Sequence, residues 1–357
     1  MTDTGKAWMR REGISKLSMK ALLEESSISW LQTSGAHKED QVYALMGIAS
    51  DADKLGINID YSKPWAQVYT EVVAAYLRRG NLWFLNYCQA GLTGRSGGLP
   101  TWVPDWSEGF RGARVSAHWS PPKQHLGTLQ SVTIPNIDDV LRSRQLSLRG
   151  VLADEVSWVS TERPAISVNQ LSSSPHRAAL SDWMRTIVVQ CRPHTKREIW
   201  DVLICGSRNL PLPEKHRTNT TEEQKRVLLD NAFDAILAER HDDVVNMLRL
   251  FTLGGRREED PIVNEVVMSF LRCFMQATGF KCVFRTKNGR LGLAPAGIGK
   301  GDRVAVFMGN DNAFVLRPVT RLLRKTHWKV MCEAYVQGVM TDEKLMKDAV
   351  VEDLVLE

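Results

Sequence analysis

The chain of 357 residues has no apolar run approaching the roughly 18 residues that a membrane-spanning helix needs. Residues 1–16 are polar and do not contain the apolar stretch of a secretory signal. With 43% hydrophobic and 24% charged residues, the composition is that of a globular protein with a substantial core. We therefore expect a cytoplasmic protein without a membrane span.

Signatures of the common catalytic and metal sites are also missing. There is no Gly-x-Ser-x-Gly elbow for a serine nucleophile. The glycine-rich stretches 91–98 and 289–302 do not join a strand to a helix as phosphate-binding loops do. The six cysteines form no Cys-x-x-Cys pair, so neither a zinc site nor a disulfide framework is indicated (Cys88, Cys191, Cys205, Cys273, Cys282 and Cys332). We expect no metal, no cofactor and mostly buried, reduced thiols.

The net charge of +5 is small for this length, and basic residues alternate with acidic ones along most of the chain. Nucleic-acid binding requires a concentrated basic face. We therefore expect no nucleic-acid partner.

Helical spacing dominates the first part of the chain. Apolar residues between Leu17 and Ala49 suit two short helices joined by the polar turn Thr33–His37. A third helix follows, with Ser62 as a cap and Pro64 in its first turn. Its apolar stripe is formed by Val68, Val72, Ala75 and Tyr76.

Residues 91–130 are rich in Gly, Pro, Ser and Trp, which predicts an ordered loop region. Strand character returns at 145–160. Helical periodicity then recurs in five segments, 175–191, 196–205, 221–237, 241–253 and 261–277. After Gly279 the pattern changes to short strands, with a hairpin turn at Asn288–Gly289.

These patterns predict an α+β fold in which a helical N-terminal part and a helical insertion pack on a small antiparallel β-barrel or meander. We divide the chain into a helical N-terminal region with a Trp-rich loop (1–112), strands that pair with the C-terminal sheet (113–160), a helical insertion (161–278) and the C-terminal β-meander or barrel (279–357). We expect one interleaved globular unit.

Three segments, in order, resemble fungal heterokaryon incompatibility (HET) proteins. The first is Lys38–Val72, which contains the motifs DQVYALMG and DYSK, and the second is LPTWVPDWS at Leu99–Ser107. The third is the tail, with GRLGLAP, GDRVAVFMG, FVLRPV and EAYVQGVM between residues 289 and 340. Full-length members of this family carry a TIR-like HET domain with a Ser-Tyr-x-Trp-Gly type motif before these segments. No such motif occurs here, so we expect a stand-alone C-terminal region without the signalling activity of that domain.

The resemblance leaves two functions open. A HET-like region without its signalling domain resembles in kind the HET-like Diels–Alderases of fungal terpenoid pathways. This implies a cofactor-independent cyclase of secondary-metabolite biosynthesis that orients a small apolar substrate for an intramolecular [4+2] reaction in an apolar pocket. The alternative is a non-catalytic interaction or regulatory module of heterokaryon incompatibility that binds a protein partner.

The candidate site residues surround the Trp-rich loop and two apolar strands. As catalytic groups we select the polar residues Asp105, His118 and Tyr43, because a carboxylate, an imidazole or a phenol can accept or donate a proton. As substrate-binding residues we select the aromatic residues and one arginine, Trp102, Trp106, Trp119, Tyr335 and Arg317.

Each of these residues also has a structural interpretation. Trp102 and Trp106 could anchor the loop in the core while Asp105 caps its turn. Tyr43 and Tyr335 could be core residues, and Arg317 could pair with Asp302 or Glu333.

Overall fold

The computed structural model describes residues 17–28, 37–91, 98–108, 110, 135–167, 170, 173–206, 273–319, 326–339 and 350–357, with single positions between 223 and 237. Its helices and its seven-stranded sheet confirm the predicted α+β class. Most of the turn expected at Thr33–His37, the helix at 241–253 and most of the helices at 221–237 and 261–277 lie outside the described residues.

The N-terminal part consists of short helices. These are α2 (Met19–Ile28), α3 (Asp40–Met46), α4 (Ala52–Leu55), α5 (Trp65–Leu77) and the 3₁₀-helix η2 (Trp83–Tyr87). The expected apolar stripe of α5 is buried, with Val68 and Val72 both at 0% exposure. Burial of this stripe against α2, α3 and the sheet is what holds so short a helix in place.

The expected cap at Ser62 is wrong. Pro64 is the N-cap of α5, and no side chain caps this helix. The hydroxyl of Ser62 instead donates a hydrogen bond to Oδ1 of Asp60 over 2.6 Å. The nearby carboxylate is a stronger acceptor, and Ser62 lies two residues before the N-cap position.

The strands form a closed ring. Their bounds are β1 (Leu146–Val159), β2 (Lys281–Thr286), β3 (Leu291–Pro295), β4 (Arg303–Phe307), β5 (Ala313–Val319), β6 (His327–Val336) and β7 (Glu352–Leu356). Their order is β2-β3-β6-β5-β4-β1-β7, and further pairings of β2 with β1 and of β6 with β7 close the circuit. The long strand β1 makes this closure, because it pairs with β7 at its start, with β4 in its middle and with β2 at its end. Within the described sheet, all pairings are antiparallel except β6 with β7.

The hairpin expected at Asn288–Gly289 is confirmed. It joins β2 to β3, and Gly289 adopts a φ of 81°. This left-handed conformation suits glycine, which has no Cβ.

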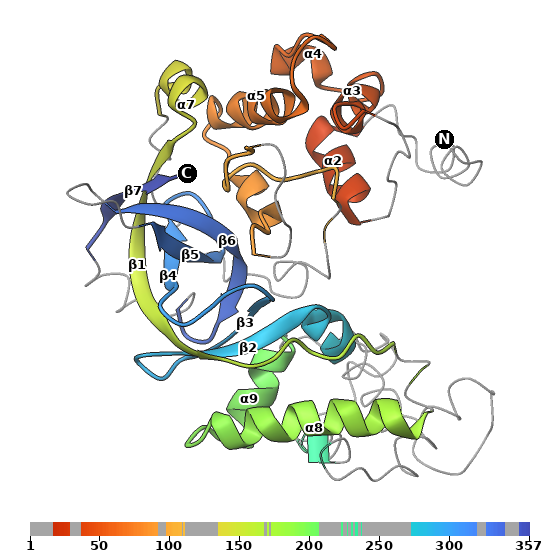
Figure 1. Ribbon diagram of the computed structural model, residues 1–357, viewed down its shortest axis with the longest axis vertical. Helices are drawn as coiled ribbons and strands as arrows, with labels where there is room; N and C mark the ends of the chain where they lie inside the picture. The colour runs from red at the N-terminus through yellow and green to blue at the C-terminus, as the bar shows by residue number, and fades with distance from the viewer. Residues whose placement is uncertain are drawn as a thin grey trace.

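Three buried clusters make up the core. One draws on all six strands from β1 to β6 and fills the ring, with Val304 and Val306 of β4 among its members. The alternate residues Ala305 and Phe307 face the opposite way and pack with the N-terminal helices and α7 (Ile137–Ser143). The third cluster packs α8 (Ser174–Gln190) and α9 (Lys196–Leu203) on β2 and β3. Figure 1 shows this arrangement, with the ring in the middle, α2–α5 and α7 at one end and α8 and α9 at the other.

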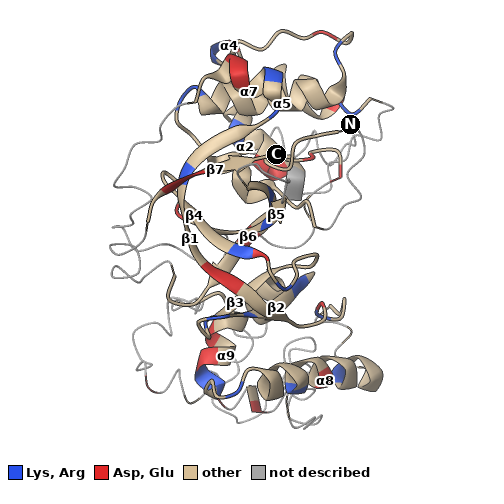
Figure 2. Ribbon diagram, turned by 60° about the vertical axis from the view of Figure 1, so that its left-hand side comes forward, with Lys and Arg blue, Asp and Glu red and all other residues tan. Residues whose placement is uncertain are grey.

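Charged residues are distributed over the described part of the ribbon. Figure 2 shows Lys and Arg interleaved with Asp and Glu on the helices at both ends and on the ring. In the part of the chain that the structure describes, no helix has the length and apolar character to cross a membrane.

Candidate functional site

The loop Leu99–Ser107, called the Trp-rich loop below, is tied to the sheet by Thr101. The backbone N–H of Thr101 donates to the carbonyl oxygen of Glu357 over 3.0 Å, and its hydroxyl donates to the same oxygen. Its Oγ1 also accepts the N–H of Val330 in β6 over 3.0 Å. Next to it, Trp102 is 0% exposed and donates its Nε1–H to the carbonyl of Arg144 over 3.3 Å. Thr101 thus holds the loop against β6 and the end of β7, and Trp102 holds it at the residue that ends α7.

Asp105 is engaged within its own turn. Its Oδ1 accepts the N–H of Ser107 over 3.1 Å and the hydroxyl of Ser107 over 2.6 Å. This is the geometry by which an aspartate stabilises a turn, and a carboxylate held in this way is poorly placed to act as a general base.

Trp106 packs against α5. It is 5% exposed, and its ring meets that of Tyr69 edge-to-face with centroids 5.1 Å apart. Burial, with a smaller effect from the negative charge of Asp105, raises the pKa of Tyr69, whose hydroxyl donates to the carbonyl of Lys38 over 2.7 Å. The Nε1 of Trp106 is buried and has no hydrogen-bond partner within the described structure. Trp106 therefore anchors the loop in the core and keeps one free donor.

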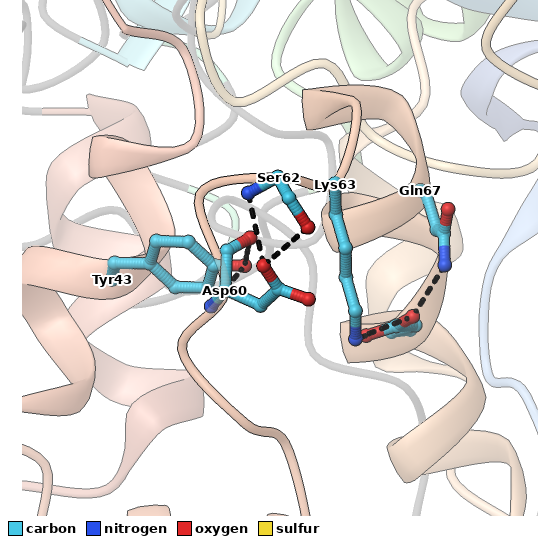
Figure 3. A network of polar contacts seen from close by, with 6 residues as sticks. Tyr43, Asp60, Ser62, Lys63 and Gln67 are labelled. Atoms are coloured by element: carbon cyan, nitrogen blue, oxygen red, sulfur yellow. Dashed lines mark hydrogen bonds and ion pairs between the residues drawn. The ribbon is translucent and has the colours of Figure 1, made fainter.

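Tyr43 fixes a second loop. Its hydroxyl donates to the carbonyl of Asp60 over 3.0 Å and accepts the N–H of Asp60 over 3.2 Å. Tyr43 itself is 4% exposed, so its buried hydroxyl holds the segment around Asp60 in place through these two hydrogen bonds (Figure 3). With both its donor and its acceptor used, the hydroxyl has no free role in proton transfer in this conformation.

Arg317 forms the ion pair with Asp302 that the sequence suggested as one alternative. Its Nε and one terminal nitrogen lie 2.8 and 2.9 Å from the two carboxylate oxygens of Asp302, and the same nitrogen donates to the carbonyl of Gly297 over 2.9 Å. The hydrogen bond to Asp302 raises the pKa of Arg317. This bidentate pair links the start of β4 to β5.

Tyr335 lies on the other side of the ring, in the cluster that packs α8 and α9 on β2 and β3. It is 7% exposed, and its hydroxyl donates to Oδ2 of Asp201 over 3.3 Å. His118 and Trp119 fall outside the described residues. Of the described candidates, Tyr43, Trp102 and Trp106 share the cluster of the N-terminal helices, whereas Tyr335 and Arg317 belong elsewhere.

Lys281 was not singled out from the sequence, although it is the most completely buried basic residue in the described part of the chain, at 1% exposure. Its Nζ donates to the carbonyl of Ala277 over 2.7 Å, and burial lowers its pKa. Lys281 lies on the face of β2 opposite to Cys282, which belongs to the cluster inside the ring, and its place at the start of an apolar strand is the signal that could have marked it as buried. Over the described residues, no group of three or more His, Cys, Asp and Glu side chains could hold a metal ion.

Part of the sequence that forms the ring is similar to a known domain. Residues 261–356, which contain β2 to β7, match the model of the Het-6 beta-barrel domain. The chain is also 26% identical, over 381 aligned residues, to heterokaryon incompatibility protein 6, OR allele, of Neurospora crassa. These matches confirm the resemblance to the fungal heterokaryon incompatibility family.

The alignment with this relative covers 96% of the chain and 54% of the Neurospora protein. The chain thus spans about half the length of its curated relative. No solved structure matches it.

Proposed function

We propose that this chain acts as a non-catalytic interaction module in heterokaryon incompatibility, where it binds a protein partner. The similarity to a heterokaryon incompatibility protein over nearly the whole chain supports this role. The carrying observation is that the polar groups of the Trp-rich loop hold the fold together: Thr101 binds the strands, Trp102 binds Arg144, and Asp105 binds its own turn. A loop used in this way organises a surface and does not supply acid–base chemistry.

A fusion assay in a filamentous fungus tests the proposal. The chain is expressed in one strain, which is then fused with isogenic partners that carry different heterokaryon incompatibility alleles. We expect at least one pairing in which the viability of fused cells falls relative to the empty vector. Equal viability in all pairings, with the protein shown to accumulate, contradicts the proposal. A Trp102→Ala variant, in which the buried anchor is lost, serves as the unfolded control.

The Diels–Alder cyclase stays a prediction with one supporting observation. The free, buried Nε1–H of Trp106 is the kind of single donor that could polarise a dienophile in an apolar environment. The test is co-expression with terpenoid-pathway genes in a fungal host and analysis of the products. A new cyclised product that disappears with Trp106→Phe would favour the cyclase function. An unchanged product profile would refute that function.

A further inference from the structure

The segment of residues 56–63, called the DYSK loop below, presents two apolar side chains to solvent. Ile59 is 55% exposed and Tyr61 is 59% exposed. The other large exposed hydrophobics of the described structure stand singly on other elements (Val189, Val227, Phe280 and Val350). Single exposed apolar residues need no explanation, whereas the DYSK loop places two large apolar side chains in solvent within three residues.

The DYSK loop is held in one conformation although it is exposed. The peptide of Asp60 is bound on both sides by the hydroxyl of Tyr43, and Oδ1 of Asp60 accepts both the N–H and the hydroxyl of Ser62, over 2.9 and 2.6 Å. Figure 3 shows these bonds between Tyr43, Asp60 and Ser62. The ring of Tyr61 packs edge-to-face on that of Tyr43, with centroids 5.2 Å apart. A surface fixed before binding loses little conformational entropy when a partner binds.

The charges around Tyr61 are negative. Its hydroxyl donates to Oδ1 of Asp40 over 3.0 Å, and this hydrogen bond, with partial desolvation of the hydroxyl and the negative charges of Asp40 and Glu39, raises the pKa of Tyr61. The basic residue of the loop, Lys63, is turned to Glu71, whose carboxylate oxygens lie 2.8 and 3.0 Å from its Nζ. Asp40 binds Tyr61 and Asp60 binds Ser62 through Oδ1, so Oδ2 of each aspartate can accept a donor from outside.

From this geometry we infer that the DYSK loop is a docking surface for a basic segment of a partner protein, with an arginine of the partner on the ring of Tyr61. A guanidinium stacks on an aromatic face and donates to carboxylates at the same time, which a lysine ammonium does less well. Ile59 supplies the apolar contact beside it, and tyrosine and arginine are the residues that most often dominate binding interfaces. The inference rests on the proposed role as an interaction module and specifies the chemistry of the partner.

The probe is a fluorescein-labelled peptide of sequence Leu-Arg-Ile-Arg-Leu, and binding to the full chain is followed by fluorescence anisotropy. We expect saturable binding that weakens as salt is raised. Tyr61→Ala should weaken it by about 10-fold or more. Asp40→Asn should weaken it by about 3-fold, and Tyr61→Phe should keep most of it because the ring remains. The matched control is Val189→Ala, which removes an equally exposed apolar side chain from α8 and should leave binding unchanged.

The inference is overturned if the arginine peptide shows no saturable binding, or if Tyr61→Ala and Val189→Ala bind it equally. A peptide with glutamate in place of arginine should not bind, and binding of both peptides alike also contradicts it. The peptide assay and the fusion assay fail independently. If the viability of fused cells falls but the peptide does not bind, only the docking surface is refuted. If the peptide binds in a Tyr61-dependent way but fusion has no phenotype, only the proposed function is refuted.

Discussion

The hydroxyl of Thr101 lies between two strands: it accepts the N–H of Val330 in β6 over 3.0 Å and donates to the carbonyl of Glu357 after β7. Glu357 in turn donates its N–H to the carbonyl of Trp328 over 3.0 Å. The Trp-rich loop thus joins β6 and β7, the one parallel pair of strands in the described sheet.

Thr101→Val is therefore expected to destabilise the protein by about 1–3 kcal/mol, because it leaves the buried N–H of Val330 and the partly buried carbonyl of Glu357 with one partner fewer. Urea unfolding followed by tryptophan fluorescence measures the loss. The matched control is Thr161→Val, at an exposed position whose backbone carbonyl, retained in the variant, accepts the hydrogen bonds of Ser160 and Trp183. Equal midpoints for the two variants would show that the Thr101 hydroxyl does not stabilise the fold.

The ion pair of Arg317 and Asp302 should contribute more to the free energy of unfolding than an exposed ion pair does. The side chain of Asp302 is 3% exposed, so Arg317→Met leaves a buried carboxylate without its bidentate partner, at an expected cost of about 2–3 kcal/mol. The same substitution at Arg142, whose pair with Asp139 is exposed on both sides, should change the free energy of unfolding by less than about 0.5 kcal/mol. A comparable loss in both variants, measured in urea, would refute the distinction.

The sequence predicted elements that depend on local patterns. The stripe of α5 and the Asn288–Gly289 turn are examples, because spacing and turn chemistry act over a few residues. The pairing of Arg317 with Asp302 was one of two alternatives. The antiparallel register of Arg303 with Leu316 decides it, because this register brings Asp302 beside Arg317. Strand β7 was not predicted, since its five residues become a strand through pairing with distant β1 and β6.

The candidate site was less predictable than the fold. Residue chemistry grouped Tyr43 with Tyr335, but the chain places them in separate clusters on opposite sides of the ring. The cap expected of Ser62 failed because Asp60, two residues away, binds its hydroxyl. Sequence patterns report which residues are apolar or polar, and they do not report which neighbour satisfies a buried hydroxyl or carboxylate.

The start of α9 should give the protein a specific sensitivity to acid. Glu198 accepts hydrogen bonds from the N–H and the hydroxyl of Thr195, and these bonds lower the pKa of its carboxyl below the ordinary value of 4.5. Because the folded pKa is the lower one, the stabilisation is fully present above 4.5 and is lost as the pH falls through the folded pKa.

Thr195→Ala removes the hydroxyl of this capping box, so it should lower the free energy of unfolding by about 1 kcal/mol at pH 7. Between about pH 5 and pH 3 the free energy of unfolding should fall less in the variant than in the wild type. The difference should be about the contribution of the cap, which the variant has already lost. Urea unfolding at a series of pH values measures both effects, and Glu198→Gln, which cannot titrate, should show the same shallow pH dependence. Parallel pH profiles for all three proteins would contradict the assignment.

Gly206 offers a test of how tightly α9 packs on the ring. It follows α9 with a φ of 63°, and a Cβ at this position would lie 2.4 Å from Oη of Tyr335. Gly56 has nearly the same φ, 65°, and a Cβ added there would meet nothing within 4 Å, so it reports the backbone cost alone. Gly56→Ala should cost about 1–2 kcal/mol through the left-handed conformation.

Gly206→Ala should cost about 1–3 kcal/mol more than Gly56→Ala, because the added methyl group must displace the tyrosine ring from its contact with Asp201. In a Tyr335→Phe background the nearest atoms lie at 3.0 and 3.1 Å, so most of the additional cost should disappear. The double-mutant cycle, measured by urea unfolding, isolates this coupling. If the cost of Gly206→Ala is the same with tyrosine and with phenylalanine at position 335, the hydroxyl of Tyr335 is not what limits the space beside Gly206.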